Sequence, residues 1–166
     1  MNYLMNYKNK QMKKIIFYST ILLVLLTSTA LKLEEVQCVA ADLKNELKPL
    51  LKPEYKYDSS QITRIVYKKD AFQTGIEVPL FMGEKYRFLF NTAGLPKDVE
   101  ITIYDKKPGN KTKNALFTLS KVKEAGRHLY SFEPEKSKKM YIVYTIPAAE
   151  EEDLKGCLVF LLGYKL

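Results

Sequence analysis

Carboxylates near the C-terminus are the residues whose types and spacing best suit chemistry. Hard oxygen ligands of this kind bind Ca²⁺, and two further acidic residues can join them if their loops converge. The cluster lacks the alternating Asp/Asn and Gly of a dedicated calcium loop, so a solvated loop between strands is the competing interpretation. The weak calcium candidates are Glu150, Glu151, Glu152, Asp153, Asp98 and Asp105.

Other catalytic arrangements are missing from the sequence. His128 is the single histidine, so it has neither a second imidazole for a metal site nor a Ser/His/Asp setting. Phosphate-binding glycine loops and the CxxC, HExxH and GxSxG patterns are absent. We therefore predict a protein that is not an enzyme and needs no cofactor. A hydrolase built on the carboxylates above is the third hypothesis, although nothing fixes the separation that an acid–base pair needs.

Tyrosine is frequent and tryptophan is absent. Exposed tyrosines can form a platform for a glycan or a peptide, whereas cross-strand pairs that stabilise a sheet explain them equally well. The absence of tryptophan disfavours a dedicated sugar-stacking site. The tyrosines concerned are Tyr55, Tyr57, Tyr67, Tyr104, Tyr141, Tyr144 and Tyr164.

Residues 1–30 have the pattern of a secretory signal peptide. Lys13 and Lys14 precede an apolar run over residues 15–26, which is nearer the length of a signal h-region than the ~20 residues of a membrane span. Cleavage after Ala30 and cleavage after Ala41 both satisfy the small-residue rule. We predict a secreted or periplasmic protein with no membrane span after signal cleavage, and an uncleaved anchor is the alternative.

The cleavage site decides the chemistry of the two cysteines. In an oxidising compartment Cys38 and Cys157 can form one bridge, provided that cleavage follows Ala30 and Cys38 survives. If cleavage follows Ala41, Cys157 is a lone buried thiol that behaves as a small hydrophobe. We favour the bridge and leave the second possibility open.

The charge of the chain is positive but dispersed. Net charge is +8, yet four of the 27 basic residues lie in residues 1–30. The remaining lysines are interleaved with Asp and Glu, which is typical of a solvated surface rather than of a nucleic-acid footprint. We expect no nucleic-acid partner.

The hydrophobic pattern predicts one short helix followed by strands. Leucines recur at helical spacing within residues 42–53, with Asp42 suited to the N-cap and Pro53 ending the pattern. Apolar residues then alternate with turn signals at intervals of roughly 8–12 residues, which is typical of an antiparallel β-sandwich or jelly roll. The about eight strands are expected at residues 62–67, 72–81, 85–90, 98–104, 115–119, 128–132, 139–146 and 155–165.

These elements give an all-β protein in three segments. Residues 1–30 are the signal peptide, residues 31–53 an N-terminal segment with the short helix, and residues 54–166 the β-sandwich domain. The last strand, 155–165, is apolar at nearly every position. We therefore expect it to be covered on both faces and to organise the sandwich.

The stretch from Val78 to Ile146 resembles the bacterial pre-peptidase C-terminal domain, a small jelly-roll module. An apolar strand, Gly83 and a Tyr-x-Phe strand succeed one another over residues 78–88, and residues 98–105 are similar to the Asp-rich strand of that family. Residues 139–144 resemble its late strand. Glu100 stands where the family often has Asp, and no peptidase is attached. The whole chain also resembles short uncharacterised secreted proteins of Bacteroidota.

The resemblance implies a module that binds or targets and does not catalyse. We expect an exported, non-catalytic β-sandwich that binds an unknown protein or glycan at the cell envelope or outside the cell. The alternative is a structural or assembly subunit of an envelope complex, in which the apolar final strand pairs or packs against a partner.

Overall fold

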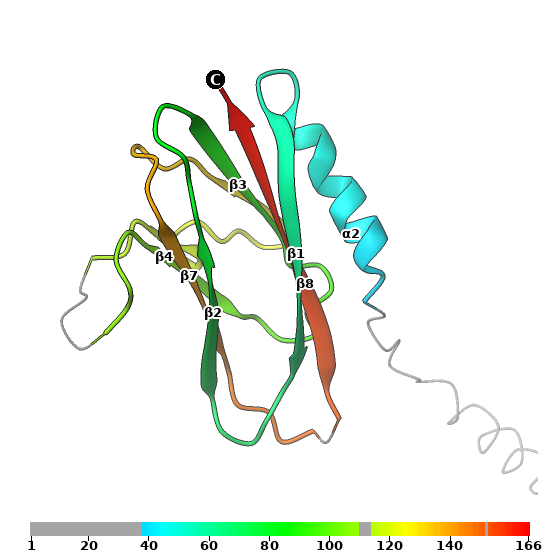
Figure 1. The fold of residues 1–166 in the computed structure, drawn as a ribbon. Coiled ribbons are helices and arrows are strands. Elements are labelled where there is room, and N and C mark those ends of the chain that lie inside the picture. The colour runs from blue at the N-terminus through cyan, green and yellow to red at the C-terminus, as the bar shows by residue number, and fades with distance from the viewer. Residues whose placement is uncertain (1–37, 110–113, 152) are drawn as a thin grey trace, which may run out of the picture. The chain divides into compact units, whose positions relative to one another are not determined.

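The computed structural model describes residues 38–109, 114–151 and 153–166. These residues belong to one compact unit, Val36–Leu166, built from two facing β-sheets with a helix against one of them (Figure 1). The predicted signal peptide and Glu152 lie outside the described residues. Among the helices that are described, none combines the length and the apolar character that crossing a membrane requires.

Each sheet has four antiparallel strands. Sheet A has the order β1-β8-β3-β6, and sheet B the order β2-β7-β4-β5. The strands of sheet A are β1 (Lys56–Val66), β8 (Lys155–Lys165), β3 (Lys85–Asn91) and β6 (Leu129–Phe132). Those of sheet B are β2 (Phe72–Val78), β7 (Met140–Ile146), β4 (Glu100–Tyr104) and β5 (Phe117–Thr118).

The pairing between strands is nested along the chain. The first strand pairs with the eighth, the second with the seventh, the third with the sixth and the fourth with the fifth. Two further ladders, β3–β8 and β4–β7, complete the sheets. This is the topology of a jelly roll, a long hairpin wrapped into two sheets, and it confirms the predicted fold class.

The start of β1 and the end of β2 differ most from the predicted strand boundaries. β1 begins at Lys56, six residues before the expected start at Ile62, because pairing with β8 holds a polar stretch that has no apolar alternation. β2 ends at Val78, since Pro79 lacks the N–H that would continue the ladder. Gly75 lies in a regular part of the β2–β7 ladder, and a Cβ there would lie 2.5 Å from the carbonyl oxygen of Ile142. Glycine is required by the close approach of β7.

The predicted helix is present in two parts. α2 (Ala40–Leu47) continues as the 3₁₀ helix η1 (Lys48–Leu51), with Pro49 in the first turn of η1, where its missing N–H is tolerated. The predicted N-cap is wrong: Val39 occupies that position and Asp42 lies in the first turn, where a negative charge favours the helix dipole.

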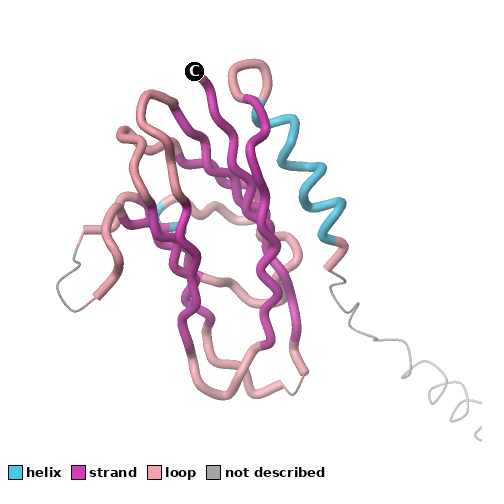
Figure 2. Tube along the Cα trace, in the orientation of Figure 1, coloured by secondary structure: helices cyan, strands magenta, loops and turns pink. Residues whose placement is uncertain are grey.

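β8 is buried on both faces, as its apolar run predicts. Leu158, Phe160 and Leu162 point into the core between the sheets. The alternate residues, Cys157, Val159 and Leu161, pack beneath Leu43, Leu47 and Leu51 of α2 and η1. Figure 2 shows the helix lying against the strands of sheet A. Because β8 also has a strand on each side, it offers no partner the free edge or face that the assembly hypothesis invoked.

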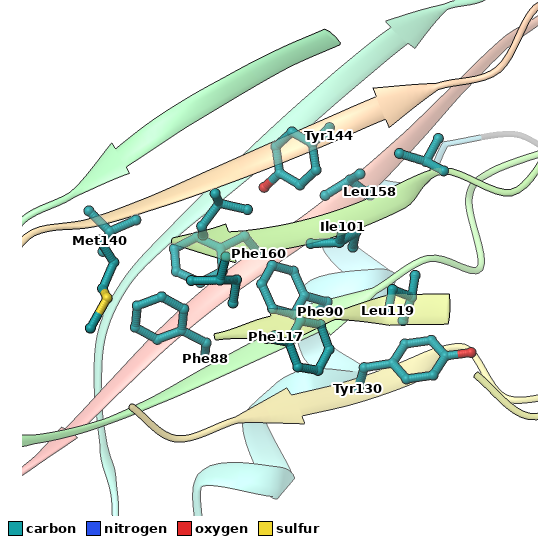
Figure 3. Close-up of a cluster of buried hydrophobic side chains, with 14 of the residues drawn as sticks. Phe88, Phe90, Ile101, Phe117, Leu119, Tyr130, Met140, Tyr144, Leu158 and Phe160 are labelled. Carbon is teal, nitrogen blue, oxygen red and sulfur yellow. The ribbon is translucent and has the colours of Figure 1, made fainter. Parts of the chain in front are cut away.

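The core between the sheets is dominated by aromatic rings (Figure 3). Phe160 from β8 lies 5.3 Å from Phe88 and 5.4 Å from Phe90, centre to centre, and Phe117 from sheet B stacks on Phe90 at 6.2 Å. These separations are those of favourable ring pairs. The side chains of β3 and of the stretch that leads into β4 alternate, and the inward ones are buried: Tyr86, Phe88, Phe90, Val99, Ile101 and Ile103.

A disulfide joins Cys38 to Cys157, with 5.6 Å between their Cα atoms. The bridge that the sequence favoured is therefore present. Cys38 precedes α2 and Cys157 lies on the outer face of β8, so the bond ties the start of the helix to the strand that the helix covers.

Replacing Cys38 by Ser is expected to destabilise the protein by about 4 kcal/mol, because the bridge closes a loop between residues 119 apart in the sequence. Cys157 then remains as a small buried hydrophobe. Urea unfolding in the presence and absence of a reducing agent measures the effect. Reduction should lower the urea midpoint of the wild type to that of Cys38→Ser and leave the midpoint of the variant unchanged. A wild-type midpoint that is insensitive to reduction contradicts the prediction.

Tyr144 carries a phenol that is buried without a well-formed hydrogen bond. Burial raises the pKa of Tyr144, and the nearby Thr63 hydroxyl opposes this shift, although it too lacks a hydrogen-bond partner among the described residues. Because an unpaired buried hydroxyl is costly, Tyr144→Phe is expected to stabilise the protein by about 1 kcal/mol in urea unfolding.

The matched control is Tyr67→Phe, since the buried Tyr67 donates a 2.6 Å hydrogen bond to the carbonyl oxygen of Lys97. That substitution should destabilise by about 1 kcal/mol. Equal losses at Tyr144 and Tyr67 would show that the Tyr144 phenol is paired after all.

Candidate binding groove

A groove of about 870 Å³ lies on the outer face of sheet A, between the helices and the edge strand β6. It exists because α2 and η1 pack over β8 and β3 and leave β6 uncovered. Glu46 and Leu50 form the helical wall, while Ala93 and the half-buried Leu129 contribute apolar surface to its lining. The groove is thus built from segments that are distant in the sequence.

Arg87 closes one end of the groove. Its Nε donates a 2.7 Å hydrogen bond to Oε1 of Glu133, and its Nη1 donates at 2.8 Å to the carbonyl oxygen of Leu50. The guanidinium lies 4.1 Å from the centre of the Tyr55 ring, and the Tyr55 hydroxyl donates to Oε2 of Glu133 at 2.7 Å. The network fixes η1, β3 and the end of β6 relative to one another.

The environment of Glu133 favours its charged form. Partial burial acts to raise the pKa of Glu133, but hydrogen bonds from Tyr55 and Arg87 outweigh it and hold that pKa below its ordinary value. Burial, followed by the bond to Glu133, raises the pKa of Tyr55. Glu133 is therefore a fixed carboxylate and the counterion of Arg87.

Asn91 anchors the helical wall from below. Its side chain is completely buried and its Nδ2 donates to the carbonyl oxygen of Leu43 at 3.0 Å and to Glu46 Oε2 at 2.8 Å. Its Oδ1 accepts from the Ala93 N–H at 3.0 Å. A buried amide satisfied in this way holds α2 on β3 and orients the Glu46 carboxylate.

Arg127 and Tyr130 shape the opposite wall. The Tyr130 hydroxyl donates to the carbonyl oxygen of Arg127 at 2.6 Å, which fixes the turn that leads into β6. Arg127 Nε donates to the carbonyl oxygen of Leu129 at 3.0 Å, and the guanidinium lies 5.4 Å from the Tyr130 ring. The Arg127 guanidinium is exposed, and its Nη1 forms an ion pair with Oε1 of Glu124 at 3.4 Å.

His128 and Ser131 line the same groove. In the part of the chain that the structure describes, their side chains form no hydrogen bond with each other or with a carboxylate. A nucleophile needs an adjacent base to be activated, so the groove, as described, lacks the arrangement used in acyl transfer. Its polar groups suit recognition.

The carboxylates of the calcium hypothesis are dispersed. Asp98 pairs with Lys123, Asp105 with Lys138, Glu151 with Lys97 and Asp153 with Lys155. The pair between Lys97 and Glu151 brings the start of β4 beside the loop before β8, but Asp105 follows the other end of β4. Glu150 is exposed. Among the described residues, no three His, Cys, Asp or Glu side chains are placed to share a metal ion.

The lysines also explain the titration of two of these carboxylates. A hydrogen bond from Lys138 lowers the pKa of Asp105, and one from Lys97 lowers the pKa of Glu151. Surface ion pairs of this kind contribute little to stability.

The tyrosines do not gather on one exposed face. Tyr55, Tyr67 and Tyr144 are buried, and Tyr57 lies beside Lys44. Tyr104 and Tyr141 are directly opposite on β4 and β7, and Tyr164 is half-buried. The cross-strand position of Tyr104 and Tyr141 agrees with the structural interpretation of these rings.

Sequence reasoning missed the groove and its arginines. The chain has only three arginines among 27 basic residues, and two of them, Arg87 and Arg127, line this one groove. Arginine forms planar, fixed contacts that lysine does not. The few arginines of this lysine-rich chain could therefore have been singled out in the sequence as candidate binding residues.

The described residues form a disulfide-linked jelly roll with a helix-walled groove on the outer face of sheet A. A comparison with protein-family models gives no match, and a comparison with curated proteins gives none either. The likeness to the pre-peptidase C-terminal domain stays a prediction.

Replacing Glu133 by Gln is expected to flatten the acid dependence of stability. The folded-state pKa of Glu133 is lowered, so its contribution is complete above its ordinary pKa of 4.5 and is lost as pH falls through the lower folded value. Urea midpoints between about pH 6 and pH 3 should therefore fall less steeply in Glu133→Gln. Glu135→Gln, at an exposed neighbour, is the control and should titrate like the wild type. Identical slopes for both variants contradict the prediction.

Proposed function

We propose that this protein is an exported, non-catalytic binding module, and that the groove beside β6 holds an extended segment of a partner protein at the cell envelope or outside the cell. A disulfide suits an oxidising compartment, and the signal-peptide pattern of residues 1–30 supports export. Since the bridge contains Cys38, cleavage after Ala30 fits it and cleavage after Ala41 does not.

The observation that carries the proposal is the chemistry of the groove. Its lining combines apolar side chains, such as Leu50 and Leu129, with charges of both signs from Arg127 and Glu46. A polypeptide offers apolar and charged side chains together, whereas a nucleic acid calls for a single positive field. Arg127 lies over the Tyr130 ring, which is buried, so this tyrosine offers no open ring face to a sugar. A peptide segment is therefore favoured over a glycan.

The test is a photocrosslinking residue placed at Ser131, in the groove, in the protein exported with its own leader. A matched probe at Gln73, on the exposed outer face of sheet B, is the control. We expect a partner crosslinked from Ser131 and not from Gln73, to be identified by mass spectrometry and then purified.

Affinity for the purified partner decides the proposal. Ser131→Trp fills the groove and should weaken binding at least about tenfold, a loss of 1.4 kcal/mol or more, while Gln73→Trp leaves binding unchanged. Equal crosslinking from both positions overturns the assignment of the groove. Hydrolysis of peptides, esters or glycosides by the purified protein overturns the non-catalytic function.

A second candidate function is a structural or assembly subunit of an envelope complex. β8 is enclosed, but β1 is an eleven-residue strand at the edge of sheet A. A free edge of that length favours assembly through strand pairing.

A further inference from the structure

The free edge of β1 carries a regular row of unpaired backbone groups. The Tyr67 N–H donates to the carbonyl oxygen of Leu154 at 2.9 Å, and the antiparallel register continues from there along β8. Hydrogen bonding alternates in such a ladder, so Gln61, Thr63 and Ile65 bond to β8. The N–H and C=O groups of the alternate residues face away from β8, and these residues are Ser60, Ile62, Arg64 and Val66.

The side chains of that row also suit another strand. Ile62 and Val66 are 40% and 49% exposed, and both lie on the face of sheet A that carries Cys157. Two β-branched residues beside an unpaired backbone form a template for strand addition. Arg64 stands between them and has no ion pair within the described chain.

We propose that β1 pairs antiparallel with β1 of a second copy of this chain, so that two A sheets join into one continuous sheet. A two-fold axis through Thr63 sets the register. Ile62 then lies opposite the partner's Arg64, and Ser60 opposite the partner's Val66. The aliphatic stem of Arg64 covers the exposed Ile62 of the other copy.

The charges at the two ends of β1 favour this register and favour a second copy of the chain as the partner. With the axis at Thr63, Asp58 and Lys68 flank the paired segment and face each other at both of its ends. Neither residue has an ion pair among the described residues, and the Lys68 Nζ lies 5.0 Å from the centre of the Phe72 ring. Asp58 lies in the register shift between Tyr57 and Ser59, which makes the contact a flanking ion pair rather than a rung of the ladder.

The neighbouring registers bring like charges together. An axis at Arg64 places the two Arg64 side chains directly opposite each other, which is destabilising on a sheet. An axis at Ile62 brings Lys56 opposite Lys68 and leaves Asp58 facing Val66. An edge that is complementary to itself with the axis at Thr63, and repulsive in the two adjacent registers, fits an isologous dimer.

The test measures the monomer–dimer equilibrium of the exported protein by sedimentation over a range of micromolar concentrations. We expect a dimer that is weakened at least tenfold by Asp58→Lys and by Lys68→Glu, because each change puts like charges at both ends of the interface. The double variant exchanges the two charges and should return the dissociation constant to within threefold of the wild type. Lys69→Glu alters the net charge equally in the same turn and should have little effect.

A second pair of variants tests the apolar row. Ile62→Lys places a charge at an exposed position and should abolish the dimer while the circular dichroism spectrum stays unchanged. Val122→Lys, at an apolar residue that is 42% exposed outside the edge, is its control. A protein that is monomeric at every concentration overturns the proposal, as does a charge exchange that fails to restore dimerisation. The groove is lined from the opposite edge of sheet A, so Ser131→Trp should leave the dimer intact.

Discussion

The double-sided burial of β8 is the constraint on which the rest of the structure depends. Its residues are apolar on both faces, so each face needs its own cover. Sheet B covers one face with aromatic rings, and α2 with η1 covers the other with leucines. Without the helix, Val159 and Leu161 would be exposed to water, at a cost of roughly 1.5–3 kcal/mol for each side chain.

The helix must also approach β8 closely. A Cβ at Gly163 would lie 2.3 Å from the Cδ2 atom of Leu51, so the glycine leaves the space that the Leu51 side chain of η1 fills beside the strand. At the other end, Gly94 lies against the disulfide, where a Cβ would come within 2.7 Å of the Cys157 carbonyl oxygen. The glycines and the bridge together bring helix and strand into contact over their common length. Residues 38–53 are therefore part of the folded unit and not a linker to it.

The sequence predicted those parts of the fold that depend on local pattern. The apolar run of β8 and the alternation of Tyr86, Phe88 and Phe90 can be recognised in the sequence, because apolar residue types at these positions indicate buried side chains. The early part of β1 was missed, since its polar residues are held by β8 and not by their own pattern.

The site was hidden for a different reason. Arg87 and Glu133 are 46 residues apart, and no sequence pattern in either segment predicts their contact. The sequence favoured the disulfide but left the free thiol open, because the bridge depends on where the leader ends as well as on the two cysteines. The calcium hypothesis treated acidic residues as a group, whereas tertiary structure gives several of them separate lysines.

The edges of the two sheets are protected unequally. β5 has two residues and β6 has four. The carbonyl oxygen of Leu129, which faces away from β3, accepts a hydrogen bond from Arg127. β2 is stopped by Pro79, and its Glu77 is paired with Lys139. Short strands, prolines and charges are the usual defences of an edge. β1 has eleven residues and only Arg64 within its apolar row. β1 is the longest edge strand and, apart from the register shift between Tyr57 and Ser59, has fewer of these defences, which supports the proposed pairing of two copies.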